Sequence, residues 1–164
     1  MTDAVRAMMI MAVLGAVPPA AYCSPPPVEA AVDAAWAEVD AAWNARDAAR
    51  FSAVYTEDSS FEFVDRRHAL DGRAAIRQHF EEQFPRSAAE YSHHTCIETV
   101  RVVADGAVTV DGIVEVRRAP AEAGQESSLF RTFAIFAVMV PAADAWQIDA
   151  LRVYQLPVEL PVPR

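Results

Sequence analysis

The sequence has few of the residues that define several large classes of protein. Of its 164 residues only two are cysteines, Cys23 and Cys96, too few for a disulfide framework. It contains no Cys-x-x-Cys and no His-x-x-x-His spacing, so no metal site and no cofactor are predicted. Basic residues number 14 against 23 acidic ones, which makes the formal net charge −9. Because such a charge repels phosphate, neither nucleic acid nor an anionic membrane surface is an expected partner.

A long apolar run is also missing near the N-terminus. The run Ala7–Val17 has eleven residues, which is too short to span a bilayer. Arg6 precedes it and small residues follow it, so residues 1–24 are predicted to be a secretory signal peptide. We therefore expect a secreted or periplasmic protein with no membrane contact after signal removal; the alternative is a cytoplasmic protein with an N-terminal tail. Residues 25–156 are predicted to form one domain and residues 157–164 a Pro-rich tail.

The first part of this domain has mostly helical patterns. Apolar residues recur at helical spacing over residues 28–49, with a break at Asn44–Asp47, and a second short helix is predicted at 51–55. Residues 59–64 alternate as a half-buried strand does, and residues 65–71 are predicted to form a turn. A third helix is expected at 72–84, where Pro85 ends it.

The remainder of the domain has the two-residue period of strands. Strands are predicted at residues 91–103, 107–118, 129–140 and 146–155. Together with the preceding helices this order predicts an α+β domain, with three N-terminal helices packed on one face of a strongly curved antiparallel sheet. A sheet that curls over helices leaves a hollow at its open end, and this hollow is the expected ligand site.

Four short motifs resemble those of one superfamily. They are AWNARD at 42–47, VYTED at 54–58, GRAAI at 72–76 and WQI at 146–148. In order and spacing they resemble the nuclear-transport-factor-2-like superfamily, and within it the SnoaL-like and SgcJ/EcaC-type small domains, over Val28–Leu156. The resemblance implies a cone-shaped barrel. Its members include ketosteroid isomerase, limonene-epoxide hydrolase, scytalone dehydratase and polyketide cyclases, but also binding and assembly modules, so the fold alone does not fix a function.

One specific activity of that superfamily is excluded by the residues present. The resemblance aligns Val39 and Ala134 with the two oxyanion donors of ketosteroid isomerase, and Phe63 with its base. All three positions are apolar here. An isomerase of that mechanism needs a base and hydrogen-bond donors at the developing enolate, so we do not expect that reaction.

Three other polar residues are our candidate catalytic groups. Asp65 lies two residues after Phe63, which a strand would place on the same face, and the resemblance places His79 at a pocket-lining position. Arg152 shares a strand face with Trp146 by period two. We expect Asp65, His79 and Arg152 to converge on the hollow, the first two as an acid–base pair and Arg152 holding a carboxylate or enolate.

The candidate ligand-binding residues are hydroxyl donors, apolar residues and one histidine. Period two sends one of His93 and His94 inward, and His94 is our candidate. The other expected contacts are Tyr154, Tyr55, Trp43, Phe61, Phe63 and Val39. Each has a purely structural alternative: the aromatic residues can form ordinary core, the histidine pair a solvated strand start, and Asp65 a turn cap. For Arg152 the alternative is an ion pair with an acidic neighbour such as Asp65.

Two functions from different classes remain open at this point. The first is a cofactor-free enzyme of the isomerase, cyclase, dehydratase or hydrolase type, acting on a small and largely apolar organic molecule. The second is a non-catalytic binding or dimeric assembly domain. The outer sheet face is often a dimer interface in the resembled family. Because Asp111, Glu115 and Arg117 would make that face polar, at most a modest homodimer is expected.

Overall fold

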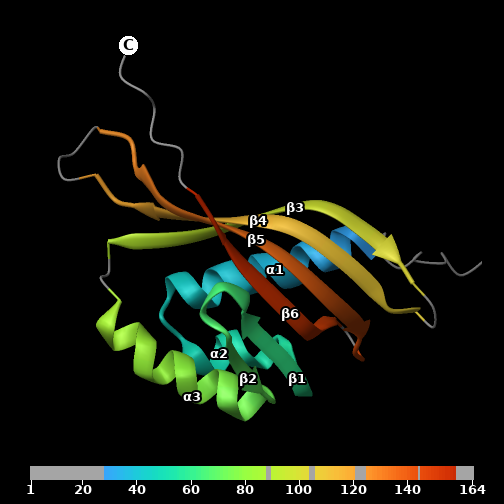
Figure 1. Ribbon diagram of the computed structural model, residues 1–164. Helices are drawn as coiled ribbons and strands as arrows, with labels where there is room; N and C mark the ends of the chain where they lie inside the picture. Colours follow the sequence, from blue (N-terminus) through green and yellow to red (C-terminus); the bar gives the residue numbers. More distant parts are fainter. Residues whose placement is uncertain (1–27, 88–89, 104–105, 121–124, 144, 158–164) are drawn as a thin grey trace, which may run out of the picture.

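The computed structural model describes residues 28–87, 90–103, 106–120, 125–143 and 145–157 (Figure 1). The predicted signal peptide, and the predicted tail beyond residue 157, lie outside the described residues. Within the described ranges, no helix combines the length and the apolar character that a membrane crossing requires.

Three helices lie together on one face of the sheet (Figure 1). Helix α1 spans Val28–Asn44 and buries Val32, Trp36 and Val39, which share one face because they are spaced three or four residues apart. Helix α2 spans Ala48–Ala53, and its N-terminus is capped by the Asp47 carboxylate, which accepts from the Arg50 N–H at 2.9 Å. Helix α3 spans Arg73–Gln83. Helix α2 begins and ends earlier than the range predicted for it, 51–55.

Among the described residues the sheet has six strands and is antiparallel at all but one of its pairings. The strands are β1 Tyr55–Phe63, β2 His68–Asp71, β3 Tyr91–Val102, β4 Val108–Arg118, β5 Ser128–Pro141 and β6 Trp146–Leu156. Their order across the sheet is β2-β1-β6-β5-β4-β3, and β1 runs parallel to β6. The apolar core lies between the concave face and the helices. The α+β arrangement predicted from the sequence is confirmed.

Two local predictions are corrected around β1. The strand begins at Tyr55, four residues before its predicted start, because Tyr55 pairs with Ile148 of β6 and is fully buried. The predicted turn at 65–71 contains β2, which pairs with β1. Three of the four β2 residues are exposed, so this edge strand has little of the apolar alternation that predicts a strand.

The Asp71-Gly72-Arg73 segment joins the sheet to helix α3. Gly72 adopts φ +85°, a conformation that favours glycine, and its N–H donates to the Ser59 carbonyl at 2.7 Å. Arg73 then donates through Nε to the Tyr55 carbonyl at 2.7 Å and pairs through Nη1 with Glu57 at 2.5 Å. The segment therefore holds the start of α3 against β1, which fixes the direction in which the helix leaves the sheet.

A bulge in β6 changes which side chains face the core. Val138 of β5 lies opposite Ala150, whereas Met139 lies opposite Ile148, so Asp149 is an extra residue on β6. Ile148 and Leu151 are both buried although they are three residues apart, which a strand of regular period two does not allow. The bulge resolves this conflict by reversing the alternation after Ile148.

Candidate functional site

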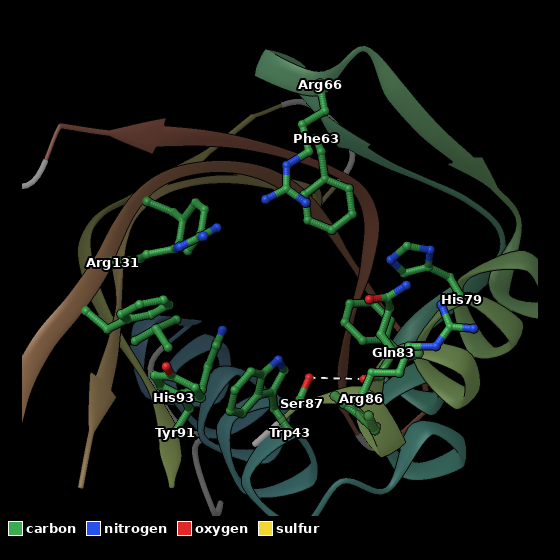
Figure 2. Close-up of a pocket in the computed structure, with 15 residues that line it drawn as sticks. Trp43, Phe63, Arg66, His79, Gln83, Arg86, Ser87, Tyr91, His93 and Arg131 are labelled. Atoms are coloured by element: carbon green, nitrogen blue, oxygen red, sulfur yellow. Dashed lines mark hydrogen bonds between the residues drawn. The ribbon is translucent and has the colours of Figure 1, made fainter. Parts of the chain in front are cut away.

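A cavity of about 420 Å³ opens between the helices and the curved sheet (Figure 2). Much of its wall is aromatic, with contributions from α1, β1, α3 and β5: Trp43, Phe63, Phe80 and Phe133. Polar side chains lie between these rings, among them His79, Gln83 and His93. A mostly apolar hollow of this size with a few polar groups suits a small organic molecule.

His93 and Asp40 form a close pair at the cavity wall. The Nδ1 atom of His93 on β3 lies 2.7 Å from Oδ1 of Asp40 on α1, and their side chains are only 12% and 16% exposed. Thr95 adds two hydrogen bonds to the same carboxylate, from its N–H at 2.8 Å and its hydroxyl at 2.7 Å. Burial by itself would raise the pKa of Asp40, but the bonds from His93 and Thr95 outweigh it and hold that pKa below its ordinary value.

This pair determines the protonation of the imidazole. An ionised carboxylate only accepts hydrogen bonds, so the proton on the neutral His93 ring is assigned to Nδ1. The other ring nitrogen, Nε2, is then the unprotonated one. A cavity-lining imidazole with a free Nε2 and a carboxylate behind Nδ1 can take up a proton and be stabilised once it is charged.

The backbone of His93 is held as firmly as its side chain. The Asn44 side chain accepts from the His93 N–H at 2.8 Å and donates to the His93 carbonyl at 2.9 Å. Because β3 is an edge strand, these groups would otherwise lack a partner strand. The Trp43 ring stacks on the imidazole, with centroids 5.1 Å apart and planes inclined by 27°. Helix α1 therefore orients His93 through three side chains of a single turn, at positions 40, 43 and 44.

Arg46 secures the aromatic part of this wall. Its guanidinium lies 4.1 Å from the centroid of the Trp43 ring. It donates to the Trp43 carbonyl at 2.8 Å and to the Tyr91 carbonyl at 2.7 Å, which ties the end of α1 to the start of β3. Three residues of the AWNARD motif, Trp43, Asn44 and Arg46, thus build or support the cavity wall.

His79 lines another part of the cavity, on helix α3 (Figure 2). Its ring centroid lies 5.7 Å from that of Phe63 and 5.2 Å from that of His68. Burial lowers the pKa of His79, and repulsion from His68 and Arg66 lowers it further, against a smaller opposite effect of Glu82. His79 is therefore a neutral imidazole at pH 7.

The expected convergence of Asp65, His79 and Arg152 does not occur. Strand β1 ends at Phe63 and the chain turns into a 3₁₀ helix at Val64–Arg66, so the period-two argument no longer applies at Asp65. Asp65 is exposed and accepts from the Gln155 N–H at 2.5 Å. Of the three residues, only His79 lines the cavity.

Arg152 lies on the outer face of the sheet because of the β6 bulge. Its Nε atom pairs with Glu62 at 2.9 Å, and its Nη1 atom donates to the Ser60 hydroxyl at 3.3 Å. The expected ion pair therefore exists, but its acidic member is Glu62 and not Asp65. Tyr154, two residues further along the same face, is 40% exposed and also outside the cavity wall.

The remaining predicted contacts divide between the cavity and the core. Trp43 and Phe63 line the cavity, whereas Val39 and Phe61 are buried core residues that do not. Tyr55 is fully buried, and its hydroxyl has no hydrogen-bond partner among the described residues. Burial raises the pKa of that hydroxyl.

His93 takes the inward place for which His94 was the candidate. His94 is 69% exposed, and its Nδ1 lies 3.8 Å from the Asp40 carboxylate. The prediction that one of the two histidines faces inward is correct, but the choice between them is wrong. The residues at 91, 93, 95 and 97 are the less exposed ones. Which of two adjacent residues faces inward is therefore decided by the pairing of β3 with β4 and by its packing against α1.

Sequence reasoning missed Asp40 altogether. Asp40 is on the polar side of α1, a position typical of solvent-facing residues, but this side lies against the edge strand β3. A usable signal was present. Asp40 and Asn44 are one helical turn apart, and His93 and Thr95 are two strand residues apart, so each pair shares a face and the two faces are complementary.

The fold and the cavity together define a nuclear-transport-factor-2-like domain, in which helices cover a curved sheet around a ligand-sized hollow. The chain belongs to the family of SnoaL-like domains, whose family model matches residues 34–140. No curated protein matches the sequence. Across the described residues, no cluster of three or more metal-ligating side chains is present.

Solved structures share this fold at low sequence identity. A domain of unknown function with a cystatin-like fold from Nostoc punctiforme PCC 73102 is 20% identical, with a TM-score of 0.68 over 83% of this chain and 82% of that one. A putative scytalone dehydratase from Novosphingobium aromaticivorans DSM 12444 is 14% identical, with a TM-score of 0.66 over 82% and 89%. A ketosteroid isomerase-like protein from Erwinia carotovora atroseptica SCRI1043 is 17% identical, with a TM-score of 0.60 over 79% and 96%.

Proposed function

We propose that this protein is a cofactor-free enzyme that moves a proton on a small, largely apolar organic molecule. His93 is the general base and then the general acid, and Asp40 orients it. The observation that carries this proposal is the 2.7 Å Asp40–His93 pair on the wall of an aromatic cavity. Isomerisation, cyclisation and dehydration are the reaction types that such a group serves.

The proton path follows from the hydrogen bonds of the pair. Nε2 of His93 takes a proton from a carbon beside a carbonyl group, and the resulting imidazolium is stabilised by the ionised Asp40 behind it. The same Nε2 returns the proton at another atom of the substrate. His79 on α3, neutral at pH 7, is placed to exchange a proton or to donate a hydrogen bond from a different part of the cavity. The aromatic wall keeps water from competing for the intermediate.

One class of covalent chemistry is unavailable to these residues. The 14 basic residues of the sequence are all arginines, so no lysine amine exists to form a Schiff base with a carbonyl substrate. Direct proton transfer needs no such amine and uses groups that line the cavity. Two structural neighbours are a putative scytalone dehydratase and a ketosteroid isomerase-like protein, which supports this class of chemistry.

The alternative is a domain that binds or assembles without catalysis. The outer face of the sheet supports it, since Phe136 and Tyr154 are 39% and 40% exposed there. This face would be the contact of a homodimer. Export is also part of our proposal, supported by the apolar run at Ala7–Val17, and N-terminal sequencing of the mature protein checks it.

The proposal is tested by proton exchange on a carbonyl compound. Aromatic ketones with acidic protons beside the carbonyl are incubated with the protein in D₂O, and loss of the proton NMR signal measures exchange. We expect wild-type protein to accelerate exchange of at least one ketone, and His93→Gln to reduce that acceleration roughly 100-fold or more. His94→Gln is the matched control, because it changes the adjacent exposed histidine. Exchange that survives His93→Gln contradicts the proposal, and ketone binding without exchange favours the non-catalytic alternative.

A further inference from the structure

Three arginines from three separate elements line the cavity. Arg66 comes from the 3₁₀ helix that follows β1, Arg86 from the 3₁₀ helix at Phe84–Arg86, and Arg131 from β5 (Figure 2). No aspartate or glutamate is among the described residues that line the cavity. The lining of the cavity is therefore cationic. The sequence as a whole is acidic, with a formal net charge of −9. Such a local reversal of sign favours an anionic ligand.

These arginines are also available for a ligand. Within the described residues, none of the three forms an ion pair, whereas seven other arginines each pair with a carboxylate. Arg67 likewise has no ion pair there, but it does not line the cavity. A guanidinium without a carboxylate partner presents its N–H groups to any carboxylate that arrives.

The arginines lie beside aromatic rings of the same site. The Arg66 guanidinium is 5.8 Å from the centroid of the Phe63 ring, and that of Arg131 is 5.0 Å from the centroid of the Phe130 ring. Both rings line the cavity, as do Trp43 and Phe133. A ligand with flat rings can therefore contact the aromatic wall while a carboxylate on those rings reaches a guanidinium.

We propose that the cavity takes an aromatic carboxylate, with its rings against Trp43 and Phe63 and its carboxylate among Arg66, Arg86 and Arg131. This inference rests on the proposed function only where it treats the ligand as a substrate; the binding preference stands separately. The arginines supply the positive charge, because His79, the nearby histidine on α3, is neutral at pH 7. The anionic group thus sets the orientation in which the ligand's reacting bond meets His93.

Two probes that differ in one charge test this proposal. Isothermal titration calorimetry compares 2-naphthoate with its methyl ester, which has the same ring system without the negative charge. We expect wild-type protein to bind the acid roughly tenfold more tightly than the ester, with the preference falling as salt is added. Arg66→Gln, Arg86→Gln and Arg131→Gln are each expected to weaken binding of the acid roughly three- to tenfold and to leave the ester unchanged. Thermal melts establish that each variant is folded.

The control and the contrary outcomes separate this proposal from the proposed function. Arg67→Gln removes an adjacent charge outside the cavity and is expected to leave both affinities unchanged. Equal affinity for acid and ester, absence of binding for both, or an equal loss in Arg67→Gln overturns the proposal. If wild-type protein binds 2-naphthoate more tightly than the ester but exchanges the protons of no ketone, the enzymatic function fails while the ligand class stands. Exchange on neutral ketones without any preference for the acid has the reverse meaning.

Discussion

Two acid–base pairs of similar geometry differ in what surrounds them. Asp40 and His93 approach to 2.7 Å, and Glu62 and Arg152 to 2.9 Å. The side chains of the first pair are 16% and 12% exposed, and those of the second are both 34% exposed. The first pair adjoins the cavity and the second lies on the outer face of the sheet. The distance within a pair therefore says little about its role, and its surroundings decide whether it can act on a ligand.

The two pairs also differ in what they hold in place. Asp40 accepts from Thr95 as well as from His93, so it joins helix α1 to the edge strand β3. Glu62 and Arg152 face each other on strands β1 and β6, which are already hydrogen-bonded to each other. Loss of Asp40 therefore leaves buried donors without an acceptor, whereas loss of Glu62 leaves a partly exposed arginine that water can solvate.

The largest expected effect tests whether Arg152 lies on the outer face of β6, on which this comparison depends. Leu151 is 3% exposed and points into the core, while its neighbour Arg152 lies on the outer face. We expect Leu151→Ala to lower the free energy of unfolding by about 2–5 kcal/mol, and Arg152→Ala by less than about 1 kcal/mol. Urea denaturation followed by circular dichroism measures both. Similar losses at the two positions would mean that the bulge at Asp149 does not reverse the alternation.

A smaller difference is expected between the acidic members of the two pairs. Asp40→Ala should lower the free energy of unfolding by about 2–3 kcal/mol, because it leaves the His93 ring N–H and the Thr95 N–H without their acceptor. Glu62→Ala should cost less than about 1 kcal/mol. Thr95→Val serves as an intermediate control, since it removes the hydroxyl bond to Asp40 but keeps the backbone one. If Glu62→Ala costs as much as Asp40→Ala, burial does not distinguish the pairs.

The smallest expected effect is a change in the pH dependence of stability, and it comes from the cavity-lining residue His79. The pKa of His79 is lowered in the folded protein, so below about pH 6.5 the unfolded chain binds a proton more readily than the folded one. His79 therefore makes stability fall as pH drops through 6.5 towards the folded pKa. We expect His79→Gln to flatten the dependence of the melting temperature on pH between 7.5 and 5. Gln83→Ala, which alters a cavity-lining residue of α3 without removing a titrating group, should keep the wild-type slope; a slope unchanged in His79→Gln would contradict the assigned pKa direction.

Local sequence patterns were sufficient to predict most of the helices and strands. The ranges predicted for α1, α3 and the last four strands agree with the structure to within a few residues, since each of these segments has a clear helical or two-residue period. They failed at β2, a short edge strand whose exposed residues lack that alternation, and at the start of β1. The resemblance to the SnoaL-like family rested on four short motifs. In one of them, AWNARD, Trp43 lines the cavity while Asn44 and Arg46 hold neighbouring backbone in place.

The candidate site was only partly predictable, because local periodicity places a side chain correctly only where the strand or helix is regular. His79, Trp43 and Phe63 were named from the sequence and line the cavity, because the aligned family positions and simple periodicity were enough for them. Arg152 was placed on the wrong face because a one-residue bulge reverses every side chain beyond it. The apolar spacing of Ile148, Leu151 and Val153 contains that information, but only if burial of all three is assumed in advance.

The sequence by itself therefore determined most of the elements, their order and the family, because these depend on local periodicity and short motifs. Only the tertiary structure decided which polar groups meet. Asp40 and His93 are 53 residues apart, and the polar face of α1 holds a cavity-lining histidine only because the edge strand β3 packs against that face. A contact between distant segments depends on strand register and helix docking, and a shift of a single residue in either changes which side chains face each other.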